Sequence, residues 1–211
     1  MQSFDRKAHW QSIYSQKNTT EVSWYQAEPV ISLELIANCG LRKTDPIIDV
    51  GGGASTLVDH LIDRGYRRVS VLDISNAALA AARKRLGAKA AAATWIEADI
   101  TLFTPPSKFA LWHDRAVFHF LTDARDRRDY VQALRNGLRV GGHLVVASFA
   151  IGGPGKCSGL PVIQYDAEKL GTELGPEFDL LEERSEKHVT PGQRVQEFAY
   201  FHFVRKREYE P

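Results

Sequence analysis

A run of three glycines stands between an acid and a pair of hydroxyl side chains in DVGGGAST, residues 49–56. A short apolar run over 47–50 predicts a buried strand before the glycines, and apolar spacing over 55–64 predicts a helix after them. Glycines at such a junction let a ligand reach the main-chain amides at the start of the helix. The stretch therefore predicts a ligand site, and a glycine-rich turn without a ligand is the plainer alternative.

Acidic residues stand at three predicted strand ends. Asp49 lies beside the glycines, Asp73 ends a strand over 69–72, and Asp99 follows a strand over 94–98. A carboxylate in the position of Asp73 can bind both hydroxyls of a ribose, and one in the position of Asp99 can accept from an adenine amino group. Asp49 suits a cationic group better than a phosphate, which it would repel. Helix capping explains any one of these acids, but three in register favour a nucleoside ligand.

Two common nucleotide motifs fit the glycine run poorly. The dinucleotide fingerprint G-x-G-x-x-G is matched at Gly51 and Gly53, but its third position holds Thr56. A phosphate-binding P-loop is also missing, because no Gly-Lys-Ser/Thr follows. An NAD(P)-dependent oxidoreductase and a non-catalytic nucleotide-binding protein remain as alternatives of a different class.

The elements that position these residues alternate along the chain. Strands are predicted over 47–50, 69–72, 94–98, 109–112 and 143–149, with helices over 55–64, over 76–86 capped by Ser75, and over 125–139 closed by Gly141 and Gly142. This alternation predicts a mainly parallel sheet with helices on both faces. The tail differs, because 179–188 and 194–205 flank the turn signal TPGQ and predict an antiparallel C-terminal hairpin.

Composition narrows the class of protein. With 211 residues, 44% hydrophobic residues and a net charge of +1, we expect one domain over 1–211 with no general attraction to nucleic acid or membranes. The two cysteines, Cys39 and Cys157, are far apart and form no metal-binding spacing, so no metal is expected. No apolar leader or membrane-spanning run occurs, and a cytoplasmic location is expected.

The motif series as a whole resembles that of class I S-adenosylmethionine-dependent methyltransferases. The resemblance rests on IIDVGGGAST, VSVLDIS, WIEADIT, ALWHDRAVFHFL and LRNGLRVGGHLVVASF, in this order and spacing. It implies a Rossmann-like α/β fold with a seven-stranded sheet. It also implies an N-terminal helical lid over 1–44, a cofactor-binding core over 45–150, and a substrate-side loop and hairpin over 151–211. Ser55 departs from the pattern, since many members carry a third glycine there.

The resemblance implies a role for each matching residue. Gly51 and Gly53 let the backbone approach the methionine part of S-adenosylmethionine, and Asp49 lies near its amino group. Asp73 holds the ribose and Asp99 binds the adenine. The complete expected cofactor site consists of Trp24, Asp49, Gly51, Gly52, Gly53, Asp73, Ile74, Ser75, Asp99, Ile100, His113 and Asp114.

The N-terminal segment over 9–29 is unusually aromatic, and it resembles small thiopurine- and tellurite-type methyltransferases and some protein-lysine methyltransferases. In such enzymes this segment can cover the cofactor. Trp10 is expected to pack the first helix on the core, and Trp24 to face the sulfonium in a cation–π contact. The candidate substrate contacts are Tyr14, Tyr25, Arg115, Phe118 and Tyr165.

Methyl transfer from a sulfonium is an in-line displacement that needs alignment and a dry site, and a general base only when the acceptor must lose a proton. His119 is the first candidate for this base and His113 the second, since the pKa of histidine lies near neutrality. The expected acceptor is an O, S or N atom of a small molecule, and the expected assembly is a monomer or homodimer. A protein-lysine methyltransferase is the alternative, although DRAVFH carries a histidine where such enzymes have an acid.

Overall fold

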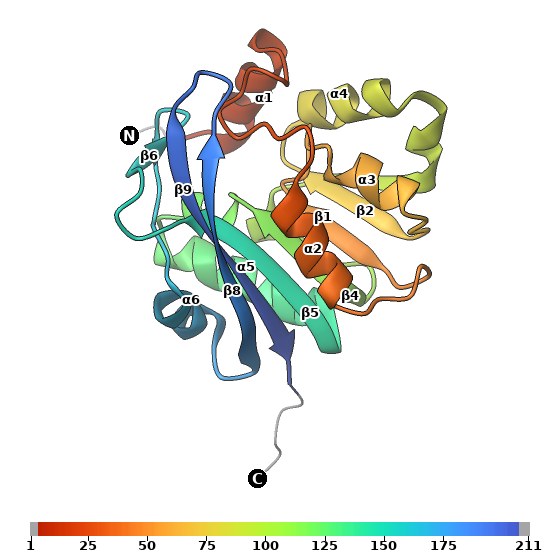
Figure 1. Cartoon of the computed structure of the whole chain (residues 1–211), viewed down its shortest axis with the longest axis vertical. Coiled ribbons are helices and arrows are strands. Elements are labelled where there is room, and N and C mark those ends of the chain that lie inside the picture. Colours follow the sequence, from red (N-terminus) through yellow and green to blue (C-terminus); the bar gives the residue numbers. More distant parts are fainter. Residues whose placement is uncertain (1–3, 207–211) are drawn as a thin grey trace.

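The computed structural model describes residues 4–206, and its centre is a seven-stranded sheet (Figure 1). The strand order is β3-β2-β1-β4-β5-β9-β8. The first five strands run parallel, and β9 is inserted antiparallel between β5 and β8. The bounds are β1 Ile47–Val50, β2 Val69–Asp73, β3 Ala93–Glu97, β4 Phe109–Arg115, β5 Leu138–Phe149, β8 Phe178–Val189 and β9 Val195–Arg205. The predicted fold class and C-terminal hairpin are confirmed.

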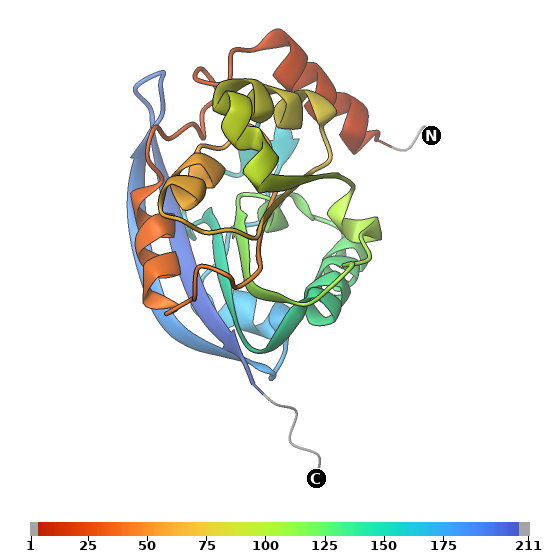
Figure 2. The same cartoon turned by 90° about the vertical axis from the view of Figure 1, so that its right-hand side faces the viewer.

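Helices cover both faces of this sheet (Figure 2). The bounds are α1 Arg6–Gln16, α2 Val30–Asn38, α3 Leu57–Asp63, α4 Asn76–Leu86, α5 Ala124–Gly137 and α6 Ala167–Leu174. Short 3-10 turns lie at η1 Gly87–Ala92, η2 Ile100–Leu102 and η3 Phe118–Phe120. One buried core joins α5 and α6 to the sheet, and a second core on the other face joins α2, α3 and α4. Within the described part of the chain, no helix is long and apolar enough to cross a membrane.

Local sequence explains where several helices begin. Ser75 caps α4 by accepting the amide of Ala78, as predicted, and Asp123 caps α5 in the same way through Arg125. The prediction that Gly141 and Gly142 close α5 is wrong. The helix stops at Gly137, and the two glycines lie in an irregular part of β5, where the pairing with β4 shifts register.

Two segments add walls to one edge of the sheet. Helix α1 lies beside α4 at the end of the molecule to which the parallel strands point (Figure 1). The loop after β5 forms a small hairpin of β6 Lys156–Cys157 and β7 Leu160–Pro161. Ligands of open parallel sheets bind outside the carboxyl ends of the strands. The helix and the hairpin therefore flank the edge at which a ligand is expected.

Candidate active site

The glycine run packs tightly against neighbouring side chains at the end of β1. Gly51 has a φ of +68°, and a Cβ there would lie 2.0 Å from Val117 Cγ2. A Cβ on Gly53 would lie 2.3 Å from Asp73 Oδ2, and one on Gly52 would lie 2.3 Å from Asp49 Oδ2. The protein itself therefore leaves no room for a side chain at Gly52 or Gly53, because the carboxylates of Asp49 and Asp73 lie directly against the backbone of the loop.

Two cavities open around this loop. The central cavity encloses about 840 Å³ and includes Asp73 and Asp99 in its lining. The glycine-loop cavity encloses about 520 Å³ and includes Asp49. The two cavities share the residues Tyr14, Trp24, Val50, Gly51 and Arg115, so they are neighbouring parts of one site.

Asp73 is a buried carboxylate at the end of β2 that faces the central cavity. It accepts the amide of Ser75 at 2.8 Å. Burial, together with the nearby charge of Asp49, raises the pKa of Asp73 to about 7, although the backbone amides that donate to Asp73 lower it. A hydroxyl-bearing ligand would supply the hydrogen bonds that favour the ionised form.

Asp49 belongs to a buried chain of three polar side chains. Its Oδ1 accepts from His113 Nδ1 at 2.7 Å, and His113 Nε2 lies 2.9 Å from Ser32 Oγ. The other carboxylate oxygen, Oδ2, is buried and has no hydrogen-bond partner among the described residues. Asp49 and His113 both line the glycine-loop cavity. An unpartnered carboxylate oxygen at a cavity wall suits a cationic ligand group.

Asp99 and two isoleucines form the opposite end of the central cavity. Asp99 Oδ1 accepts the amide and the hydroxyl of Thr101 at 2.9 and 2.8 Å. Its Oδ2 lies 3.8 Å from Arg6 of α1. Ile74 and Ile100 line the same cavity as Asp99. The structure thus brings together the carboxylate and both apolar side chains expected for the adenine end.

Asp114 lies outside both cavity linings and instead fixes the backbone after β4. It accepts the amide of Val117 at 2.8 Å, the amide of Phe118 at 3.1 Å and the hydroxyl of Tyr130 at 2.7 Å. Burial raises its pKa to about 6. Ser75 and Gly53 also lie outside the two linings, where Ser75 caps α4 and Gly53 lies against Asp73. The structure thus gives these three residues supporting contacts, and their expected contacts with a ligand stay predictions.

Arg115 is a cation held in place at the junction of the two cavities. Its Nε donates to the Tyr200 hydroxyl and its Nη1 to the Trp24 carbonyl, both at 2.9 Å. The guanidinium lies 4.5 Å from the centre of the Phe198 ring. Its Nη2 is buried without a hydrogen bond to the described residues, although Glu186 is 3.7 Å away. One donor of this arginine is therefore available to a ligand.

The N-terminal segment covers the central cavity with aromatic rings. Trp24 Nε1 donates to the Tyr14 hydroxyl at 3.2 Å, and the ring of Trp10 lies 5.8 Å from that of Trp24 and 5.0 Å from that of Phe120. All four rings line the cavity. Trp10 thus packs against the domain as expected and also faces the site. Tyr25 lines only the glycine-loop cavity.

Three further predicted site residues do not reach either cavity lining. His119 is fully buried between the rings of Phe120 and Phe149, and burial lowers its pKa to about 3. Phe118 and Tyr165 pack on one another inside the core. Burial of His119 disfavours a role as general base, and the predicted roles of all three residues stay predictions. Their neighbour Phe120 faces the cavity instead, and so do Arg6, Cys157 and Phe198, which sequence reasoning did not select.

Comparison with known families identifies the domain. Residues 47–142 match the family model described as "Methyltransferase domain". The match begins at β1 and ends in β5, so it contains the glycine loop and all three strand-end carboxylates. The chain therefore contains a methyltransferase domain. The expected family and methyl donor are thereby confirmed.

Solved structures share the fold of this methyltransferase over nearly the whole chain. A SAM-dependent methyltransferase from Anabaena variabilis is 18% identical, with a TM-score of 0.76 and coverage of 97% of this chain and 96% of the other. A structure described under "Conversion of a Disulfide Bond into a Thioacetal Group during Echinomycin Biosynthesis" is 17% identical, with a TM-score of 0.76 and coverage of 98% and 94%.

N-methyltransferase NodS from Bradyrhizobium japonicum, solved with S-adenosylhomocysteine, is another similar structure. It is 17% identical, with a TM-score of 0.69 and coverage of 95% of this chain and 99% of that one. At these identities the likeness shows the fold. No curated protein sequence matches the chain.

Proposed function

We propose that this methyltransferase transfers a methyl group to a nitrogen or sulfur atom of a small, largely apolar molecule in the central cavity. The observation that carries the proposal is the junction of the two cavities at Gly51, Trp24 and Arg115. A ligand with a nucleoside at one end and an amino acid at the other would find a matching group in each cavity. The space beside the aromatic cover is left for the acceptor.

The donor groups fit S-adenosylmethionine along its whole length. Asp73 would accept from both ribose hydroxyls, and Asp99 would accept from the adenine amino group between Ile74 and Ile100. Asp49 Oδ2, which is buried without a partner among the described residues, would hold the ammonium group. The φ of +68° at Gly51 keeps the backbone open to the ligand between these ends.

His113 would act as a positioning residue and not as a base. One of its ring nitrogens is bonded to Asp49 Oδ1 and the other lies at hydrogen-bond distance from Ser32 Oγ, so neither is free to take a proton from an acceptor. The pair keeps Asp49 Oδ2 pointed at the position of the ammonium group. This arrangement supports a role in cofactor binding for both residues.

The cofactor supplies an activated methyl group on a sulfonium, so the chain mainly has to align the acceptor and exclude water. Trp10, Tyr14 and Trp24 form a cover of rings over the site. An aromatic face near a cation is attracted to it electrostatically. Arg115 would orient the acceptor, or the carboxylate end of the cofactor, through Nη2, which makes no hydrogen bond to the described residues.

The titratable groups favour an acceptor that needs no general base. None of the described residues lining the central cavity is a histidine. Burial raises the pKa of the Cys157 thiol to about 11 and raises that of Tyr14 well above its usual value, so both stay protonated. A neutral amine or a thiolate can attack without such a base, whereas an alcohol cannot. A glycopeptide N-methyltransferase and the N-methyltransferase NodS share this fold, which agrees with the choice of an amine.

The alternative is that the methyl acceptor is a lysine side chain of a protein. The charge of the cavity disfavours this alternative. A lysine ammonium would meet the fixed cation Arg115 at the junction of the cavities.

The same proposal includes a cytoplasmic location, which the free thiols of Cys39 and Cys157 favour.

A panel assay tests this function. The purified chain is incubated with S-adenosylmethionine and panels of aromatic amines, thiols and phenols, and S-adenosylhomocysteine is quantified. We expect turnover with amines or thiols and none with phenols at neutral pH. Arg115→Lys keeps the charge but cannot present the same planar donors, so it should raise KM more than it lowers kcat. Labelling of proteins in a lysate, without turnover of any small molecule, would contradict the proposal.

A further inference from the structure

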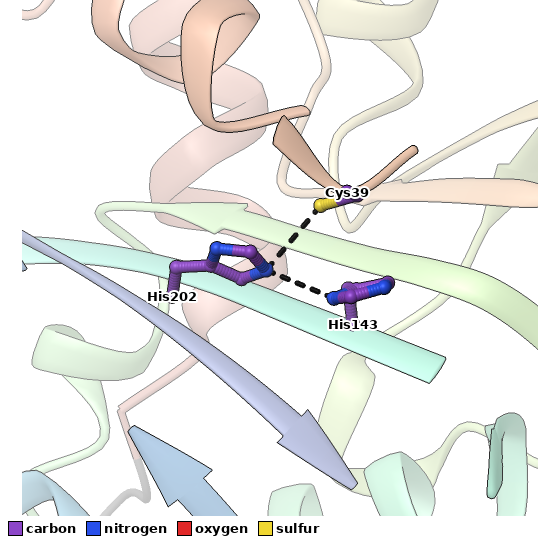
Figure 3. A group of neighbouring side chains, drawn as sticks. All are labelled: Cys39, His143 and His202. Atoms are coloured by element: carbon purple, nitrogen blue, oxygen red, sulfur yellow. Dashed lines mark hydrogen bonds between the residues drawn. The ribbon is translucent and has the colours of Figure 1, made fainter. Parts of the chain in front are cut away.

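Three side chains that could bind a metal converge outside the methyltransferase site. Cys39 lies at the end of α2, His143 in the first half of β5 and His202 in β9. Their ligand atoms all lie within 4.8 Å of one another. Figure 3 shows that Cys39 and His143 both point toward the ring of His202. The cluster is separate from both active-site cavities, whose linings include none of the three residues.

We propose that Cys39, His143 and His202 form a binding site for one zinc ion. Thiolate sulfur and imidazole nitrogen are the ligands that zinc prefers in proteins. The proposal does not depend on the identity of the methyl acceptor. It concerns an ion that ties α2 to the strands β5 and β9.

The distances are close to those of a tetrahedral site. With Zn–S bonds of about 2.3 Å and Zn–N bonds of about 2.0–2.1 Å, neighbouring ligand atoms lie about 3.3–3.6 Å apart. Cys39 Sγ lies 3.4 Å from His202 Nε2, and His143 Nδ1 lies 2.9 Å from the same nitrogen. The ion therefore requires a small separation of the two histidines, and it would hold Cys39 Sγ and His143 Nδ1, which lie within 4.8 Å of one another, at the tetrahedral spacing. It would replace two hydrogen bonds that now meet at His202 Nε2.

The backbone holds the three ligands on one face of the sheet. His143 pairs with Val204 across β5 and β9, and His202 is two residues from Val204, so both imidazoles lie on the same face. Helix α2 packs on β5 from that face and brings Cys39 over them. Cys39 and His202 are buried while His143 is half-buried. The ion can therefore enter beside His143.

A carboxylate beside the cluster favours a cation. Glu182 lies opposite His202 in the β8–β9 pairing. Arg184 Nε and Asn38 Nδ2 donate to the Glu182 carboxylate, which fixes it beside the end of α2. Glu182 thus places a fixed carboxylate beside the cluster, outside the group of three ligand atoms. On binding, the Cys39 thiol releases its proton to solvent as the sulfur–zinc bond forms.

The protonation states of the ligands agree with this arrangement. Burial lowers the pKa of His202 to about 4, so its ring is neutral near pH 7 and has a lone pair for the ion. Burial and, to a smaller extent, the charge of Glu182 raise the pKa of the Cys39 thiol to about 12.

Metal binding to the intact chain tests the site. After treatment with a chelator, the full-length protein is titrated with zinc by calorimetry, and with cobalt as a spectroscopic substitute. We expect one equivalent of zinc, a thiolate-to-cobalt charge-transfer band, and a higher unfolding midpoint that a chelator reverses. Cys39→Ser and His202→Gln should each weaken zinc binding at least ~100-fold, and Cys39→Ser should abolish the band.

Matched variants separate this site from binding elsewhere. Cys157→Ser and His188→Gln change the other cysteine and another histidine of the hairpin, so both should keep the stoichiometry and the affinity. Glu182→Gln should weaken binding ~10-fold or more if the carboxylate is a ligand or orients one. The proposal is overturned if the unmodified chain binds no zinc or shows no charge-transfer band. It is also overturned if Cys39→Ser, shown to be folded by its circular dichroism, binds zinc like the parent.

Discussion

Replacement of Asp73 by asparagine tests the assignment of the ribose contact. The carboxylate is buried at the end of β2, faces the central cavity and accepts the amide of Ser75. Asparagine keeps the size of the side chain and one acceptor oxygen. It removes the negative charge and one of the two acceptors that the ribose hydroxyls would use.

The expected loss follows from these contacts. A hydrogen bond to a charged group is worth about 1.5–3 kcal/mol, and the amide keeps part of one of the two bonds. We therefore expect a loss of about 2–4 kcal/mol, which corresponds to a ~30- to 1,000-fold higher Kd for S-adenosylhomocysteine. Calorimetric titration of the ligand measures this value directly.

The pH dependence of the same titration gives a second readout. Burial raises the pKa of Asp73 to about 7 in the free protein, while the ribose hydroxyls favour the ionised form. Affinity should therefore rise from pH 5 to pH 7 and level off above it, and this slope should disappear in Asp73→Asn. Asp179→Asn, an exposed carboxylate paired with Lys206, is the matched control. An Asp73→Asn variant that binds within threefold of the parent would refute the ribose assignment.

The remaining predictions concern Gly51 in the glycine loop, the buried hydrogen bonds of Tyr130, and His119. Gly51→Ala should lower cofactor affinity at least ~10-fold, because of its positive φ and the contact with Val117, and Val117→Ala in the same chain should restore only part of it. Calorimetry that finds full restoration would rule out the backbone argument. Tyr130→Phe removes a buried bond to Asp114 and leaves Trp112 Nε1 unpaired, so it should destabilise the fold by about 2–5 kcal/mol. Thermal and denaturant unfolding measure this loss, and a change below ~1 kcal/mol contradicts it. His119→Gln should leave the pH profile of kcat unchanged, whereas loss of one limb of that profile would reinstate His119 as a base.

The fold and the cofactor end of the site can be predicted because they depend on local signals. The order of strands follows from the alternation of elements, and each of Asp49, Asp73 and Asp99 stands where a strand ends. Parallel strands bring such ends to one edge, so sequence position alone predicts their proximity. The cap at Ser75 is predictable for the same reason, since capping is a local hydrogen bond.

The residues that face the methyl acceptor cannot be predicted from the sequence, because the packing of the 3-10 turn decides which of its side chains point into the cavity. His119 and Phe120 are neighbours in a 3-10 turn, and only the packed structure decides that Phe120 faces the cavity while His119 is buried against Phe149. A shift of one residue exchanges their roles. Gly141 misleads sequence reasoning because glycine occurs both after helices and in irregular strands.

Long-range convergence is also invisible in the sequence. Cys39, His143 and His202 come from three elements that meet only after the antiparallel β9 inserts beside β5. Their spacing matches no metal motif, so only the folded arrangement reveals the cluster. The same is true of Arg115, whose contacts with Trp24 and Tyr200 join the first and last parts of the chain.

A crystal structure with S-adenosylhomocysteine tests the central claim most directly, because the claim is that one ligand spans both cavities. The account predicts the adenosine in the central cavity, with both ribose hydroxyls on Asp73, and the amino group at Asp49 Oδ2 in the glycine-loop cavity. The sulfur atom should face the rings of Trp10, Tyr14 and Trp24. A ligand confined to one cavity, or one whose ribose does not touch Asp73, would contradict it.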